Sequence, residues 1–344
     1  MLVGVTGGTG FVGAHSVAEI VRSGHRVRLL AREEARVVKA LGPLGVDSKA
    51  VDVAVGDVTD ARAMAAFVKG TGAVLHAASV YSFDSRDREA MARTNVRGTE
   101  VVLEAARKRG VPAVHVSSVG ALFPSLSASI GPWSPVGKPR ETYLATKAAA
   151  EEIARGHQDE GAPVVITYPP ALLGPHDPHL GDQNARLRDV LRGLMPFWPS
   201  GGLPLGDVRD TALMHAEAIT APGGSRVFGP SHFLTTRAYL KTVRAVTGRA
   251  LPTLFLPAKA MFPIGKTADL VQRGWPWHIP AEYGALYTCA VAVPTDGGAP
   301  TAGIGPREFT DTVTDSVRWL HRTGRLTARQ AGTASHTESR KAMA

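Results

Sequence analysis

The chain has 344 residues, of which 44% are hydrophobic and 20% are charged, as in an ordinary soluble globular protein. This length is sufficient for two domains. The single cysteine, Cys289, excludes a disulfide framework and suits a reducing cytoplasm. The first predicted strand begins at residue 2, which leaves no room for a signal peptide, and prolines and glycines break the longest uncharged run, 110–137. We expect a cytoplasmic protein with no membrane partner.

The formal net charge is +9, from 39 basic against 30 acidic residues. Such an excess raises the alternative of a nucleic-acid surface. Six of the basic residues lie between Arg22 and Lys39, however, and four lie in the tail from residue 325 onwards. Because the excess is concentrated in two short segments, we expect no nucleic-acid partner.

Strand and helix patterns alternate through the first half of the chain. Apolar runs predict one strand from residue 2 and others at Arg26–Leu30, Ala50–Val55, Ala73–His76, Ala113–Val116 and Val164–Thr167. Helical patterns lie at Phe11–Ser23, Ala61–Lys69, about Arg88–Arg109 and Tyr143–Gly156. Glycines that suit left-handed caps follow the helices at Gly24, Gly70, Gly110 and Gly161. This alternation predicts an α/β fold with a doubly wound parallel sheet.

Prolines and glycines become dense after Pro169, which predicts a first domain over residues 1–170 and a smaller region over 171–324. We expect residues 206–230 to return to the main sheet, with a strand at Arg226–Phe228. Helices are predicted at Thr236–Thr247 and Arg307–Arg322. The polar segment 325–344 is expected to be a disordered tail.

Residues 2–13 form an apolar strand that runs into glycines spaced three apart, followed by a helix. Glycine permits the tight turn and lets backbone N–H groups approach a pyrophosphate at the positive end of the helix. This context is typical of dinucleotide binding. We therefore expect cofactor contacts from Thr6, Gly7, Gly10, Phe11, Val12 and Gly13.

Tyr143 and Lys147 lie four residues apart on one face of a predicted helix. An adjacent ammonium would lower the tyrosine pKa from about 10 and make it usable as a general acid or base. Ser118 follows the strand Ala113–Val116, at the sheet edge where ligands bind, and can hydrogen-bond a substrate oxygen. The alternative is a strand-end serine, a helix-face tyrosine and a surface lysine without chemistry.

Further motifs accompany these residues: Gly56-Asp57-Val58, His76-Ala77-Ala78, Asn95-Val96-Arg97-Gly98-Thr99, Gly174-Pro175 and Asp207-Val208-Arg209-Asp210. With them the chain resembles an extended short-chain dehydrogenase/reductase of the NAD-dependent epimerase/dehydratase superfamily. It is most similar to the dihydroflavonol-reductase and 3β-hydroxysteroid-dehydrogenase group.

The resemblance covers residues 1 to about 322 and implies a Rossmann domain with catalytic Ser118, Tyr143 and Lys147, the lysine also holding the cofactor ribose. It further implies cofactor contacts from Asp57, Val58, Ala77, Ala78 and Pro169. Family members often carry arginine just before this proline, where the chain has Tyr168.

The end of the second predicted strand bears on the choice of cofactor. NAD enzymes usually place an acid there, whereas this chain has Ala31-Arg32. A guanidinium suits a 2′-phosphate through forked hydrogen bonds, so Arg32 predicts NADP. NAD is the alternative, with Glu33 or Glu34 taking the ribose hydroxyl.

Four aromatic residues follow the fourth and fifth predicted strands and together predict an apolar or aromatic substrate pocket: Tyr81, Phe83, Phe123 and Trp133. Ordinary packing explains each of them singly. The pattern His176-Asp177-Pro178-His179 suggests a polar loop, and we expect no metal.

Three arginines, Arg186, Arg188 and Arg192, are available to clamp the diphosphate of a sugar nucleotide. Helical periodicity places two of them, Arg188 and Arg192, away from Leu187, Leu191 and Leu194. If the leucines pack the core, both arginines are expected in solvent.

These observations favour an NADP-dependent oxidoreductase that interconverts a ketone or aldehyde and an alcohol on a small, apolar or aromatic substrate. One alternative is a nucleotide-sugar epimerase or dehydratase with retained NAD. Another is a non-catalytic NAD(P)-sensing binding protein, which would not need all of Ser118, Tyr143 and Lys147. We expect a monomer or homodimer with a small-molecule substrate.

Overall fold

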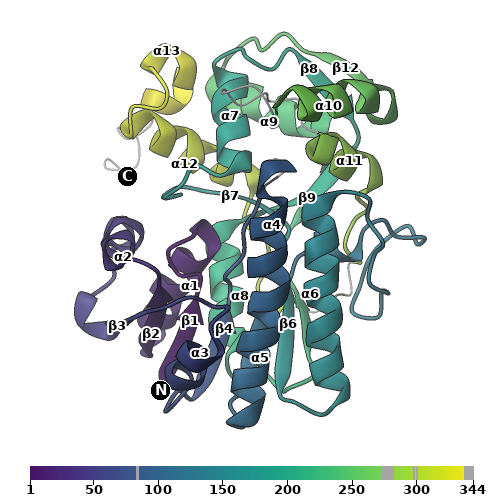
Figure 1. Cartoon of the computed structure of the whole chain (residues 1–344). Helices are drawn as coiled ribbons and strands as arrows, with labels where there is room; N and C mark the ends of the chain where they lie inside the picture. The colour runs from purple at the N-terminus through teal and green to yellow at the C-terminus, as the bar shows by residue number, and fades with distance from the viewer. Residues whose placement is uncertain (83–84, 273–282, 297–298, 300, 337–344) are drawn as a thin grey trace.

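The computed structural model describes residues 1–82, 85–272, 283–296, 299 and 301–336. Its centre is a seven-stranded parallel sheet in the order β10-β6-β5-β4-β1-β2-β3 (Figure 1). The strands are β1 (Leu2–Thr6), β2 (Arg26–Ala31), β3 (Val51–Val55), β4 (Ala73–His76), β5 (Ala113–Val116), β6 (Val164–Tyr168) and β10 (Arg226–Phe228). Because the chain winds outward from β1 in both directions, the predicted doubly wound Rossmann fold is confirmed.

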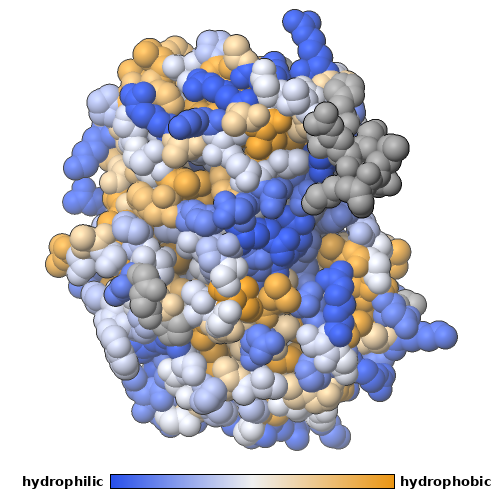
Figure 2. Space-filling view, turned by 180° about the vertical axis from the view of Figure 1, so that it is seen from behind, coloured by the Kyte–Doolittle hydropathy of each residue, from blue (hydrophilic) through white to orange (hydrophobic). Residues whose placement is uncertain are grey.

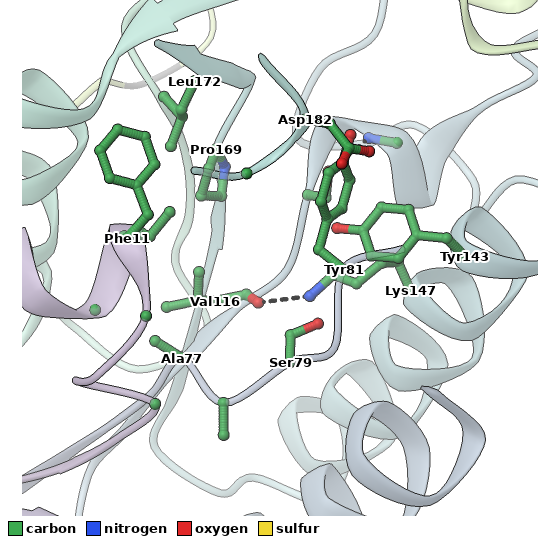
Figure 3. Close-up of a pocket in the computed structure, with 18 of the residues that line it drawn as sticks. Phe11, Ala77, Ser79, Tyr81, Val116, Tyr143, Lys147, Pro169, Leu172 and Asp182 are labelled. Atoms are coloured by element: carbon green, nitrogen blue, oxygen red, sulfur yellow. Dashed lines mark hydrogen bonds between the residues drawn. The ribbon is translucent and has the colours of Figure 1, made fainter. Parts of the chain in front are cut away.

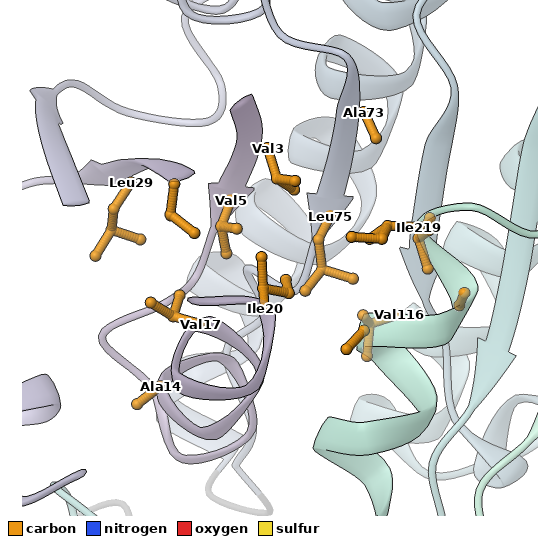
Figure 4. Packing of buried hydrophobic residues seen from close by; sticks show 14 of the residues in the cluster. Val3, Val5, Ala14, Val17, Ile20, Leu29, Ala73, Leu75, Val116 and Ile219 are labelled. Atoms are coloured by element: carbon orange, nitrogen blue, oxygen red, sulfur yellow. The ribbon is translucent and has the colours of Figure 1, made fainter. Parts of the chain in front are cut away.

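Helices cover both faces of this sheet (Figure 1). One face carries α1 (Phe11–Arg22), α2 (Glu34–Leu41) and α8 (Val208–Ala218), and the other carries α3 (Ala61–Phe67), α5 (Gly98–Lys108) and α6 (Thr142–Asp159). On the first face, Val5 and Leu75 from the strands pack with Val17 and Ile20 of α1 (Figure 4). Strands β4, β5 and β6 are buried along their whole length, which explains why their sequences are mostly apolar runs rather than alternating patterns.

The segment 88–109, predicted as one helix, is interrupted. It forms α4 (Arg88–Met91), a wider π-helical segment η4 (Ala92–Arg97) and then α5. Asn95 in the wide turn is buried, accepts a 2.7 Å hydrogen bond from the Val80 backbone and donates a 3.0 Å bond to Thr146. The π turn therefore ties the loop after β4 to α6.

The second half builds two small sheets and a group of helices above the main sheet (Figure 1). The sheets contain β7 (Ala171–Leu173), β9 (Gly202–Asp207) and β11 (His232–Thr235), and β8 (Phe197–Ser200) and β12 (Leu254–Pro257). The helices are α7 (Asp182–Leu191), α9 (Thr236–Thr247), α10 (Ala258–Gln272), α11 (Tyr283–Val291), α12 (Phe309–Arg322) and α13 (Ala328–Ala331). Short 3₁₀ turns complete the chain: η1 (Gly42–Leu44), η2 (Ser48–Ala50), η3 (Ser85–Asp87), η5 (Val119–Leu122) and η6 (Gly332–His336).

A segment within the second half, residues 208–228, returns to the main sheet. Helix α8 packs against α1, and β10 pairs in parallel with β6. Arg209 at the start of α8 pairs with Asp207 at 2.7 Å and with Asp315 of α12 at 2.8 Å, which links the two halves. Hydrophilic residues gather across the middle of the face seen in Figure 2, with apolar residues in smaller patches. No helix in the described part of the chain has both the length and the apolar character to cross a bilayer.

The disordered tail expected from residue 325 is ordered over its described part, to residue 336. Thr327 and Gln330 form a capping box at the start of α13. Leu326, Ala331 and Ala334 are buried in the core of the second half. The expectation was wrong here because it rested on the polar composition of the tail. Three spaced apolar residues that pack in the core and a helix-start motif outweigh that composition.

Candidate active site

A cleft of about 560 Å³ opens at the carboxyl ends of the central strands. Gly7, Ala77, Ser117 and Pro169, which follow β1, β4, β5 and β6, line its floor, and Figure 3 shows part of this arrangement. The second half supplies the opposite wall from α7 and α11. The cleft thus lies where doubly wound sheets place their ligands, at the point where the strand order reverses.

The glycine loop forms one end of the cleft. Gly7 has φ +77°, and a Cβ there would lie 2.4 Å from the Ala78 backbone nitrogen. A Cβ on Gly13 would lie 2.2 Å from the Gly7 carbonyl oxygen. Gly10 begins α1 with no side-chain cap, so backbone N–H groups at this helix start face a lined cleft. This cradle fits a pyrophosphate.

We expect Gly13→Ala to weaken dinucleotide binding by at least about tenfold, because the new methyl group must displace the Gly7 backbone that shapes the cradle. Fluorescence titration with NADPH and NADH measures this. Gly156→Ala is the matched control, since Gly156 lies inside α6 with open space at its Cβ and is outside the cleft. Equal affinities for wild type and Gly13→Ala would contradict the prediction.

Most of the predicted cofactor residues line the cleft, including Phe11, Val12, Val58, Ala77 and Ala78. Thr6 does not. Its hydroxyl lies in the interior, 2.8 Å from the His76 ring nitrogen, and the residue has no exposed surface. The side chain of Thr6 therefore braces β1 against β4, because alternation along β1 turns it into the core.

At the far end of β2, Arg32 lines the cleft and is exposed. Arg36, in the first turn of α2, lines the cleft as well. Arg36 was not among the residues predicted from the sequence, although its spacing of four residues from Arg32 is compatible with two side chains on the same side of a helix. Glu33 pairs with Arg36 at 2.9 Å and is outside the cleft lining, as is Glu34. Asp57 accepts hydrogen bonds from the backbone and hydroxyl of Thr59, which hold its pKa below the usual range.

The three predicted catalytic residues line one cleft. Ser118 follows β5 and accepts a 3.1 Å hydrogen bond from the Gly120 backbone, which leaves its own O–H available to donate. Tyr143 and Lys147 stand on α6. Glu141 is the N-cap of this helix, and its carboxylate accepts hydrogen bonds of 2.8 Å from the backbone of Tyr143 and Leu144. The cap fixes where α6 starts and hence where Tyr143 points.

The electrostatics around Tyr143 differ from the sequence expectation. Burial and the carboxylates of Glu141 and Asp182 raise the pKa of Tyr143 above its ordinary value. The Lys147 ammonium donates a 2.8 Å hydrogen bond to the Val116 carbonyl (Figure 3). Burial lowers the pKa of Lys147 to about 8, against a smaller opposite effect of Glu151. Tyr143 is therefore held in its protonated form at neutral pH.

The shift of Lys147 predicts a pH-dependent stability. Its pKa is about 8 in the folded protein and 10.5 for a lysine in water, so between these values the unfolded chain binds more protons at this site. The wild-type free energy of unfolding should therefore rise, relative to that of Lys147→Met, as the pH increases from 8 towards 10.5. Urea denaturation of both proteins across this range tests the difference. A gap that stays constant or moves the other way would refute it.

Two of the four predicted aromatic residues line the cleft. The Tyr81 ring stands edge-on to Tyr143 with centroids 4.6 Å apart, and Phe123 is a buried wall residue. Trp133 is 91% exposed and outside the cleft lining, so its assignment was wrong. It lies in the loop between η5 and α6, which carries it away from the sheet edge. Phe83 lies outside the described residues.

Helix α7 forms part of the cleft wall near Tyr143 and Tyr81 (Figure 3). Leu187 and Leu191 are buried as expected, but Leu194 lies beyond the helix end and is 59% exposed. Arg192 is exposed as expected and donates to the Arg325 carbonyl, whereas Arg188, also expected in solvent, is only partly exposed and pairs with Asp189 at 2.7 Å. The third arginine of this stretch, Arg186, lines the cleft together with Asp182. The sequence left its direction open.

Two other sequence motifs have structural roles. Tyr168 points away from the cleft, donates a 2.6 Å hydrogen bond to Glu151 and stacks on Phe228. Asp177 accepts hydrogen bonds from the backbone of His179 and Gly181, which shapes the loop before α7. Among the residues with described placement, no group of three or more His, Cys, Asp or Glu side chains is positioned to hold a metal.

Residues 3–224 match the NAD dependent epimerase/dehydratase family, and the chain belongs to this family. The resemblance to extended short-chain dehydrogenases/reductases is thereby confirmed. The chain is an NAD(P)-dependent enzyme of the class that acts on CH–OH and keto groups.

Two sequence relatives and one solved structure illustrate what the chain is similar to. A protein of Synechocystis sp. named as a dihydroflavonol 4-reductase is 29% identical over 340 residues, 93% of this chain and 94% of that protein. Sterol demethylase protein B of Methylococcus capsulatus is 29% identical over 274 residues, 78% of this chain and 81% of that protein. The structure of DesIV, a dTDP-glucose 4,6-dehydratase from Streptomyces venezuelae with NAD and TYD bound, superposes with a TM-score of 0.73 at 23% identity, covering 94% of this chain and 98% of that one. This last likeness shows a shared fold.

Proposed function

We propose that this chain is an NADP-dependent oxidoreductase that interconverts a ketone or aldehyde and the corresponding alcohol on a small, predominantly apolar substrate. One observation carries the proposal: Ser118, Tyr143 and Lys147 line the same cleft as the glycine loop and the arginines after β2. A cofactor cradle and an acid–base group in one cleft are what carbonyl reduction requires.

The cofactor would lie along the carboxyl ends of the strands. The glycine loop and the start of α1 suit its pyrophosphate, and Asp57 and Val58 lie at the adenine end. Arg32 and Arg36 suit a 2′-phosphate, whereas Glu33, the acid considered for the ribose hydroxyl, pairs with Arg36 and is outside the cleft lining. These side chains support NADP over NAD. When bound, this cofactor supplies or accepts the hydride.

The residues of the chain supply the proton and the orientation. In reduction, Tyr143 donates its phenolic proton to the substrate oxygen, and its raised pKa keeps that proton in place beforehand. Ser118 donates a hydrogen bond to the same oxygen. Lys147, held by the Val116 carbonyl, places a positive charge beneath the tyrosine and can reach the cofactor ribose.

The substrate end of the cleft has apolar walls, formed by Tyr81, Phe123, Pro170, Leu172 and Leu203. Flat apolar rings gain about 25 cal/mol per Å² removed from water in such a site. Two relatives are named for dihydroflavonol and sterol chemistry, which agrees with ring-shaped apolar substrates.

A panel of aryl ketones, steroid alcohols and UDP- or dTDP-sugars tests the proposal. We expect NADPH oxidation with aryl ketones or NADP reduction with steroid alcohols, and an exchangeable NADP in mass spectrometry of the purified protein. The family also contains epimerases and dehydratases, so turnover confined to sugar nucleotides with tightly retained NAD would establish that alternative. Cofactor binding without turnover of any panel member would favour a sensor.

A further inference from the structure

Arg186 is a positively charged residue in the wall of the substrate end. It lies one helical turn after Asp182 on α7, and both side chains line the cleft. A separation of four residues on one helix face corresponds to a rise of about 6 Å. Figure 3 shows Asp182 beside Tyr143 and Tyr81, and Arg186 on the following turn of α7 is also close enough to Tyr81 to interact with it electrostatically.

The surroundings of Arg186 do little to balance its charge. Its neighbours include the Cys289 sulfur, to which the guanidinium donates a hydrogen bond, and the Tyr81 and Tyr239 rings. Asp182 acts on it through longer-range attraction, and no ion pair joins its guanidinium to a carboxylate within the described part of the chain. Arg186 also borders a second, small hollow whose other lining residues include Trp198, Leu205 and Tyr239.

A guanidinium stays charged at every physiological pH, and a partly buried one without an anionic partner is costly. The other arginines of this stretch have partners outside the cleft: Arg188 pairs with Asp189, and Arg192 donates to a backbone carbonyl. Arg186 alone among the three faces the cleft. An anionic group on the substrate would satisfy it with charge-assisted hydrogen bonds.

We propose that Arg186 receives a carboxylate on the substrate, so that the enzyme acts on an apolar or aromatic ketone or alcohol that also carries a carboxylate. This inference rests on the proposed function. The planar fork of one guanidinium matches one carboxylate, while a sugar-nucleotide diphosphate carries more charge than a single arginine offsets. Apolar and aromatic side chains that line the same cleft, such as Tyr81 and Phe123, would contact the body of the substrate.

Ligand binding to the full-length protein saturated with NADP tests the assignment without depending on turnover. The probes are 2-naphthoate, 2-naphthamide and 2-naphthyl phosphate, measured by isothermal titration calorimetry. We expect wild type to bind the carboxylate at least about tenfold more tightly than the amide. Arg186→Gln should remove this preference and leave amide affinity within about threefold, which also shows that the pocket remains folded. Arg186→Lys should retain part of it.

The matched control is Arg192→Gln, which removes the same charge from an exposed position on the other side of the helix. It should behave as wild type. The assignment is overturned if wild type binds carboxylate and amide equally, if it binds neither, if Arg186→Gln keeps the preference, or if the phosphate alone binds. A carboxylate preference in a protein that reduces no ketone would support the subsite and reject the proposed function.

Discussion

The Tyr143→Phe variant is expected to reduce ketones at least about a hundredfold more slowly than wild type, the low end for loss of a general acid. The phenolic proton is lost, while the ring and its edge-on contact with Tyr81 are kept. Steady-state turnover should therefore fall while NADPH affinity, measured by fluorescence titration, stays the same.

Tyr81→Phe is the matched control for this variant, because it removes a hydroxyl from the neighbouring ring. It should retain turnover within about tenfold of wild type, since Tyr81 forms a wall and is not the proposed proton donor. Near-normal activity of Tyr143→Phe would remove the residue from the mechanism, and a large loss in both variants would point to the shape of the wall instead.

Replacing Arg32 and Arg36 with alanine should change cofactor preference. Each lost charge-assisted hydrogen bond to a 2′-phosphate costs about 1.5–3 kcal/mol, so NADPH affinity should fall by at least about tenfold in either single variant and further in the double variant. NADH, which lacks this phosphate, should bind nearly as before. Titration of each variant with both cofactors measures the difference.

Arg97→Ala provides a control of equal charge change, because Arg97 pairs with Glu100 on the surface and is outside the cleft lining. It should leave both affinities unchanged. If the affinities for NADPH and NADH fall equally in the Arg32 and Arg36 variants, the arginines bind the adenosine but do not distinguish the 2′-phosphate. NAD then becomes the better assignment.

The first half of the fold could be predicted because its signals are local. Buried β-branched runs gave β4 and β5 at their observed limits, and the glycines after the helices at 24, 70, 110 and 161 all have positive φ. Positions after a strand and on a helix face led to Ser118, Tyr143 and Lys147, which line one cleft and are the proposed catalytic residues. The π turn at Asn95 was not predicted, since it arises from hydrogen bonds to Val80 and Thr146, which are distant in sequence.

The second half was harder to predict because its strands pair across long separations. Strands β8 and β12 pair although more than fifty residues separate them, and proline and glycine obscure their pattern. Trp133 was misplaced because a long loop follows Ser118, and a loop can carry a side chain anywhere on the surface. The direction of Arg186 into the cleft depends on how α7 is rotated against the core, and the burial of Leu187, Val190 and Leu191 fixes that rotation.

The return of the chain through α8 and β10 affects how this enzyme can be divided. A fragment ending at residue 170 would lack the edge strand paired with β6 and the helix that packs on α1. The apolar residues of α1 that face α8 would then meet water. Fusing these first 170 residues to the substrate region of another enzyme is therefore unsuitable as a way to change specificity. Chimaeras should instead exchange the segment between β6 and α8 and keep both ends of the sheet.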